Sequence, residues 1–152
     1  MNPHEPFIRR TNRLAIEAAK KGNHPFGAVL AHEGEVIAEA ENTVNTDRDP
    51  TRHAELNLVV KVNRVHPPDF LKESTLYAST APCLMCAANI WRTGIKKVVY
   101  GVTYETFSSL VPEDHKYVSI EEVYRLLDTP LHAIGGILEE ECLKAYEYWP
   151  ED

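Results

Sequence analysis

The chain has 152 residues, a length that suits one domain with one hydrophobic core. Its net charge of −7 and pI near 5.5 disfavour a partner held mainly through phosphate contacts, because such binding depends on lysine and arginine. The three cysteines, an odd number, argue against a disulfide framework. The sequence shows neither an export signal nor an apolar run long enough to span a membrane. We therefore expect a cytoplasmic protein with no membrane partner.

The first elements in chain order are a helix and a hairpin. Apolar residues at helical spacing predict an amphipathic helix over Phe7–Lys21, which Gly22 ends. Two short β-prone runs follow, Phe26–Ala31 and Glu35–Ala40. The turn signal His32–Gly34 between them makes a hairpin the simplest connection.

The middle of the chain predicts a loop and a second helix. Asn42–Pro50 is polar and is expected to be a loop. A helix is expected from about Pro50 to Val65, with Asp49 as its cap and Pro50 in its first turn.

A strand, a helix and a strand are expected next, over Thr75–Ser79, Pro82–Arg92 and Lys97–Val102. Strands joined through a helix are usually parallel, so this stretch predicts a βαβ unit.

The last third of the chain is less regular. Thr103–Tyr117 has little periodicity and is expected to be a loop with at most one short helix. A short helix opening at Ser119, a strand over Leu131–Leu138 and a helix over Glu139–Trp149 follow. The complete order indicates one layered α/β domain.

Two short motifs carry the chemistry. His53-Ala54-Glu55 and Pro82-Cys83-Leu84-Met85-Cys86 together supply three metal ligands and one carboxylate. Cys83 and Cys86 stand three positions apart in a predicted helix, which places their Cβ atoms about 5–6 Å apart on one face. That spacing suits the sulfur atoms of a tetrahedral zinc site. Both thiolates would lie near the positive end of the helix dipole, which favours their ionised form.

His53 and Glu55 lie about 200° apart around a regular helix, so they converge only near a helix end. A helix that begins at Pro50 places both residues in its opening turns. One neutral imidazole and two thiolates neutralise the charge of Zn²⁺, which leaves a weaker Lewis acid than a site with three histidines. An attacking water then needs a base, and Glu55 is the residue placed to take its proton.

Other readings of these motifs remain open. The C-x-x-C pair is also found in redox proteins, although such a pair has no use for His53 and Glu55. A structural zinc site would require a fourth protein ligand, for which Cys142 is a candidate. A zinc-stabilised interaction module is a further alternative, but a structural site needs no base, which favours an enzyme.

The order H-x-E then P-C-x-x-C resembles the signature of zinc-dependent nucleobase deaminases. The chain as a whole resembles the cytidine deaminase-like superfamily, in particular its bacterial guanine deaminase and tRNA adenosine deaminase branches. The resemblance implies a three-layer α/β/α sandwich with a mixed five-stranded sheet, a single zinc-dependent deaminase domain over residues 1–152, and a homodimer. It covers residues 7–148 and includes, besides the metal motifs, Pro25–Leu30, Asn42, Asp49–Glu55, Leu76-Tyr77 and Gly136–Cys142.

The resemblance also implies roles for individual residues. One zinc ion per chain would be held by His53, Cys83 and Cys86, with Glu55 as the catalytic proton shuttle. The residues implied in substrate binding are Phe26, which would pack on the base, Asn42, which would bond its polar edge, and Ala54. A core phenylalanine and a turn asparagine are the structural alternatives for the first two. The chain departs from the family at Ala81, where relatives carry Glu or Ser.

The resemblance leaves the substrate open. The tail from Tyr146 to Asp152 is acidic, and so is Tyr104–Tyr117, where a nucleic-acid groove would benefit from cations. A carboxylate there suits the N–H edge of guanine, and Asp114 is our candidate. We therefore predict hydrolytic deamination of a small-molecule nucleobase, with guanine favoured. Deamination of tRNA adenosine, cytosine or another aminated heterocycle is the alternative.

Overall fold

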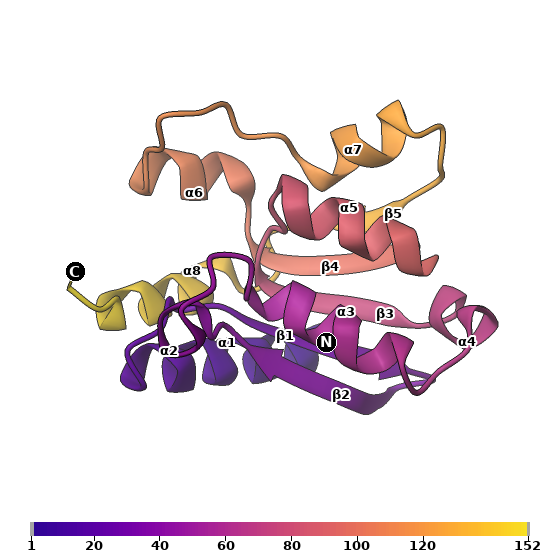
Figure 1. The fold of residues 1–152 in the computed structure, drawn as a ribbon, viewed down its shortest axis with the longest axis horizontal. Helices are drawn as coiled ribbons and strands as arrows, with labels where there is room; N and C mark the ends of the chain where they lie inside the picture. The colour runs from indigo at the N-terminus through magenta and orange to yellow at the C-terminus, as the bar shows by residue number, and fades with distance from the viewer. Residues whose placement is uncertain (1, 152) are drawn as a thin grey trace.

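The computed structural model describes residues 2–151, in which one five-stranded sheet lies between two layers of helices (Figure 1). Met1 and Asp152, the ends of the expected domain, lie outside the described residues. The strand order is β2-β1-β3-β4-β5, with β1 antiparallel to both of its neighbours and β3, β4 and β5 mutually parallel. The expected three-layer α/β/α sandwich with a mixed sheet, including the parallel βαβ unit, is confirmed.

Helices and strands are mixed along the chain. The strands are β1 Gly27–His32, β2 Glu35–Glu41, β3 Thr75–Thr80, β4 Lys97–Val102 and β5 His132–Ile134. The helices are α1 Glu5–Lys20, α2 Val44–Asp47, α3 Ala54–Asn63, α4 Pro68–Lys72, α5 Leu84–Thr93, α6 Tyr104–Leu110, α7 Ile120–Leu126 and α8 Glu139–Leu143, followed by the 3₁₀ helix η1 Lys144–Tyr148.

Successive side chains along a strand point to opposite faces of the sheet, so the core has two halves, one on each face. On β1, Ala28 and Leu30 belong to the cluster formed with α3, α5 and α7, whereas Val29 and Ala31 belong to the cluster formed with α1 and α8. Both faces are covered, which explains why the strands read as apolar runs. Figure 1 shows the starts of α3 and α5 at the same end of the molecule as α6 and α8.

The two helices that carry the motifs begin later than predicted. We expected starts at Pro50 and Pro82, but α3 begins at Ala54 and α5 at Leu84. Asp49 accepts hydrogen bonds from the backbone and the hydroxyl of Thr51, at 2.9 and 2.7 Å, and this local turn competes with a helix. Before α5, the backbone of Cys83 is extended, with ψ at 174°.

The last third of the chain also differs from the prediction. The expected strand Leu131–Leu138 is reduced to β5, because Gly135 lies against the Tyr100 ring and Gly136 adopts a φ of +80°. The expected final helix divides into α8 and η1. The prediction missed the short helices α2 and α4, whereas α6 is the one short helix allowed within Thr103–Tyr117. No helix within residues 2–151 has the length and apolar character needed to cross a bilayer.

Candidate metal centre and active site

Three ligand atoms converge where α3 and α5 begin. The Nδ1 atom of His53 lies 3.5 Å from Cys83 Sγ and 3.6 Å from Cys86 Sγ. Zinc–sulfur bonds of about 2.3 Å and zinc–nitrogen bonds of about 2.0–2.1 Å at tetrahedral angles require N···S separations of about 3.6 Å. The donor set therefore fits a tetrahedral zinc ion with three protein ligands and an open fourth position.

The local backbone explains this convergence. His53 and Cys83 are both N-cap residues with extended backbones, with ψ of 155° and 174°, so neither lies within its helix. Cys86 lies in the first turn of α5 and is fully buried. Two helix N-termini thus face one point, and their dipoles favour ionised thiolates there. The later helix starts strengthen the argument that His53 and Glu55 meet at a helix end.

The ionisation of the two thiols is coupled. The pKa of Cys83 is lowered, first by its hydrogen bond with Cys86 and also by the one with His53. The pKa of Cys86 is raised, first by the same bond with Cys83 and then by burial. The bond with Cys83 also raises the pKa of His53. A cation shared by all three groups would replace these protons.

Glu55 is the second residue of α3 and is only 6% exposed. Burial, followed by the nearby Cys83, raises the pKa of this carboxyl to about 7. A group with a pKa near neutrality both accepts and donates protons readily, as a general acid–base catalyst must. Its position beside the ligand cluster and its burial distinguish it from a solvated surface glutamate.

A cavity of about 470 Å³ opens onto this cluster. Phe26 forms part of its wall and meets two other lining rings edge to face, Phe107 at 6.0 Å and Trp149 at 5.5 Å between ring centroids. The hydroxyls of Tyr146 and Thr80 are 2.6 Å apart and join the C-terminal segment to β3. Residues of widely separated segments line the cavity: His24, Phe26, His53, Glu55, Thr80–Met85, Tyr104, Phe107, Glu113, His115–Val118 and Trp149.

The structure does not place all of the expected substrate-binding residues in the wall of the cavity. Phe26 lines the cavity, and the fully buried Asn42 lies next to it, since the Asn42 backbone donates to Phe26 O at 3.1 Å. Ala54 is fully buried at the start of α3. Asp114 is exposed and does not line the cavity, whereas its neighbour Glu113 does.

Sequence reasoning missed much of the cavity wall. Tyr104, Phe107 and Tyr117 come from the segment expected to be largely loop, where the spacing of Tyr104 and Phe107 by three residues was the available signal. Ala81, the departure noted above, also lines the cavity, and its backbone N–H donates to Val102 O at 2.8 Å. The backbone at this position is thus fixed without a larger side chain.

A family model for the cytidine and deoxycytidylate deaminase zinc-binding region matches residues 1–102, which include His53, Glu55, Cys83 and Cys86. The chain belongs to this family. It is a zinc-type deaminase, and membership supports hydrolytic deamination with zinc as the metal.

Relatives of this deaminase differ in substrate. A tRNA-specific adenosine deaminase of Aquifex aeolicus is 34% identical over 83% of this chain and 77% of its own. A probable cytosine deaminase of Schizosaccharomyces pombe is 28% identical over 94% of this chain and 90% of its own. The solved guanine deaminase of Bacillus subtilis superposes with a TM-score of 0.65 at 34% identity, covering 86% of this chain and 79% of the other. Similarity to these relatives therefore supports the reaction type, hydrolytic deamination, but does not identify the substrate.

Proposed function

We propose that this chain is a zinc-dependent hydrolytic deaminase of a free nucleobase, with guanine as the favoured substrate and xanthine plus ammonia as the products. The observation that carries the proposal is the convergence of His53, Cys83 and Cys86 with the buried Glu55 at one aromatic cavity. Zinc, when bound by the three ligands, supplies a Lewis acid that lowers the pKa of a water molecule.

The chain's own residues perform the remaining steps. Glu55 takes one proton from the attacking water and passes it to the ring nitrogen, and it then takes the second proton from the hydroxyl of the adduct and gives it to the departing amine. The water oxygen forms a bond to the ring carbon, and the bond from that carbon to the amine breaks. Phe26 packs against the plane of the base, and the aromatic wall around it excludes bulk water.

Two features support a purine with a polar edge. The Asn42 Nδ2 donor is buried and has no hydrogen-bond partner among the described residues. Asn42 lies next to Phe26 but does not itself line the cavity, so a ligand carbonyl would have to reach past Phe26 to satisfy it. Glu113 places a carboxylate in the cavity wall, where it would accept from the N–H groups of guanine. Asp114, which we proposed for this contact, stays a candidate that would have to turn inward.

A tRNA adenosine substrate is the second candidate, because the Aquifex relative is a tRNA-specific adenosine deaminase. The surface charges do not favour it. Two of the cations of α1 are engaged by acidic partners, with Arg9 3.2 Å from Glu141 and Arg10 2.6 Å from Glu39. Paired cations contribute little to phosphate binding.

An ammonia-release screen over free bases, nucleosides and an anticodon stem-loop tests the proposal. We expect guanine to give the highest kcat/KM. Release from the stem-loop alone would establish the second candidate, and stoichiometric zinc without ammonia from any compound would indicate a non-catalytic module. In the cytosine arm, a higher kcat/KM than for guanine would place the chain with the Schizosaccharomyces relative.

The variant Glu55→Gln tests the mechanism in the same assay. We expect a loss of about 10²–10⁴-fold in kcat with zinc still bound, because the amide cannot move the proton. Glu33→Gln is the matched control, since Glu33 is an exposed turn residue with 87% of its side chain accessible. Undiminished turnover in Glu55→Gln would refute the role of Glu55.

A single domain over residues 1–152, a homodimer and a cytoplasmic location also belong to this proposal. The homodimer rests on the family resemblance, the single domain also on the length, and the location on the cysteine content. Light scattering coupled to size-exclusion chromatography tests the dimer. A monomer at assay concentration would remove it and leave the chemistry of the site unchanged.

A further inference from the structure

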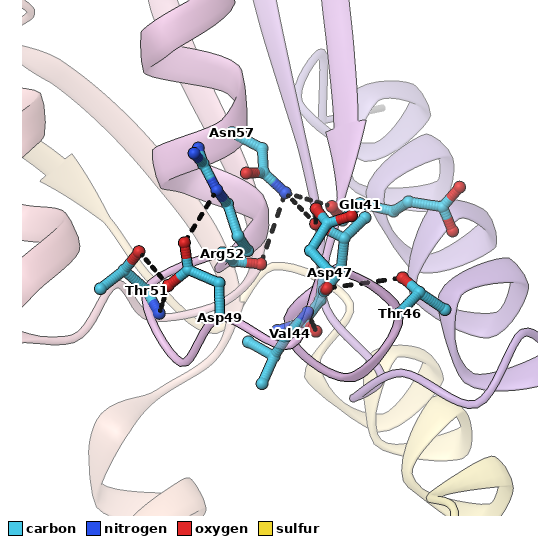
Figure 2. Close-up of polar contacts among 10 residues, drawn as sticks. Glu41, Val44, Thr46, Asp47, Asp49, Thr51, Arg52 and Asn57 are labelled. Carbon is cyan, nitrogen blue, oxygen red and sulfur yellow. Dashed lines mark hydrogen bonds and ion pairs between the residues drawn. The ribbon is translucent and has the colours of Figure 1, made fainter.

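The side chain of Asn57 contacts both ends of the loop that leads to His53. This loop comprises residues 42–52 and contains the short helix α2. Asn57 lies in α3, one turn after His53, and its Nδ2 atom is 3.0 Å from Glu41 O and 3.0 Å from Thr43 Oγ1. The same atom lies 3.4 Å from Arg52 O (Figure 2). A single amide thus donates toward the end of β2, the start of the loop and the end of the loop.

The acceptors flank two residues of the proposed site. Glu41 and Thr43 stand on either side of Asn42, and the Arg52 carbonyl belongs to the peptide group that precedes His53. The Thr43 backbone N–H also donates to Arg52 O at 3.0 Å, which closes the loop on itself. Asn57 therefore ties the backbone at both residues that the proposed function requires.

The orientation of this amide is fixed by its surroundings. Its hydrogen-bond partners are two carbonyl oxygens and a hydroxyl, and that hydroxyl itself donates to Asp47 at 2.7 Å. The acceptors require an N–H donor, so a carboxylate of the same shape would face oxygen atoms instead. Figure 2 shows Asn57 pointing from α3 into the centre of this network.

We infer that Asn57 is a positioning residue: its amide holds the loop so that the His53 imidazole faces the two thiols and Asn42 stays beside Phe26. The inference rests on the proposed zinc deaminase function. Metal–ligand distances tolerate deviations of only about 0.2 Å, so a small displacement of the peptide before His53 weakens the site. Asn57 does not touch the metal or the base, and it acts through the backbone.

The test measures zinc affinity, by competition with a chelator, in Asn57→Asp and Asn57→Ala. We expect zinc to bind about tenfold more weakly or worse, as for other outer partners of metal ligands. Asn57→Asp should lose more than Asn57→Ala, because its carboxylate repels the same oxygens. The absorption spectrum of Co²⁺ in the site should change as well, since it reports ligand geometry and a merely structural role would leave it unaltered.

Asn45→Asp is the matched control. Asn45 is an exposed residue of the same loop, and its Nδ2 atom donates to Gly22 O at 2.8 Å, away from His53. We expect zinc affinity and the Co²⁺ spectrum to be unchanged in this variant. An equal loss in Asn45→Asp and Asn57→Asp would show that any loosening of the loop suffices, and it would overturn the inference.

A second variant keeps the inference testable if both Asn57 variants fail to fold. Thr43→Val removes one acceptor of the Asn57 amide at a half-buried position, and we expect a weaker loss of zinc affinity in the same direction. The inference would be overturned if the folded Asn57 variants kept the zinc affinity and the Co²⁺ spectrum of the wild type. If those variants do not fold, the same result in Thr43→Val would overturn it. These measurements use no substrate, so a failed ammonia screen would contradict the proposed function without affecting this result.

Discussion

The contact between β1 and α1 gives a sharp prediction about stability. In Gly27→Ala, the new Cβ atom would lie 2.7 Å from Leu14 Cβ and 3.0 Å from Ala15 N, and closer still to the carbonyl oxygen of Thr11. Carbon atoms in contact prefer about 3.5–4.0 Å, so α1 must withdraw by about 1 Å. Overpacking of this kind costs about 1–3 kcal/mol, and we expect about 3 because helix backbone must move.

Urea unfolding measures this cost. With an m value of about 2 kcal/mol/M, a loss of about 3 kcal/mol lowers the midpoint by about 1.5 M. Gly34→Ala is the control, since Gly34 has a φ of +81° and no atom within 4 Å of the added Cβ. It should lose only about 1 kcal/mol through backbone strain. A loss in Gly27→Ala no greater than in Gly34→Ala would refute the argument from close packing.

Two further predictions concern metal removal and the C-terminal segment. After chelation of zinc, a thiol reagent should label Cys83 first, because the pKa of this thiol is lowered and it is partly exposed. Cys142 should stay unlabelled until the protein unfolds, since it is 1% exposed and burial raises its pKa to about 12. Mass spectrometry of labelled peptides checks this, and native labelling of Cys142 would contradict it. Tyr146→Phe removes the bond to the buried Thr80 hydroxyl and should cost about 1–3 kcal/mol in urea unfolding, whereas wild-type stability would refute that contact.

The metal ligands could be predicted, and Glu55 could be proposed as the base, because their signal is local and chemical. His53, Cys83 and Cys86 offer the donor types that zinc prefers, and Glu55 stands beside one of them in the sequence. The boundaries of α3 and α5 were less predictable, since the turn at Asp49 depends on hydrogen bonds that a propensity argument does not weigh, and Cys83 adopts an extended backbone. The later starts nevertheless place His53 and Cys83 as caps, which suits a metal centre better than a position inside a helix.

The sequence by itself determined the reaction class, because the identity and spacing of a few side chains limit the metal and the proton chemistry. It also determined the layered α/β architecture, through the alternation of apolar strands and amphipathic helices. Only the tertiary structure decided which residues enclose the cavity and what holds the loop before His53. The ring of Phe26 meets that of Phe107, 81 positions later, and that of Trp149, 123 positions later, and Asn57 reaches acceptors up to sixteen residues away. Contacts of that separation depend on how whole elements pack, and no local pattern encodes them.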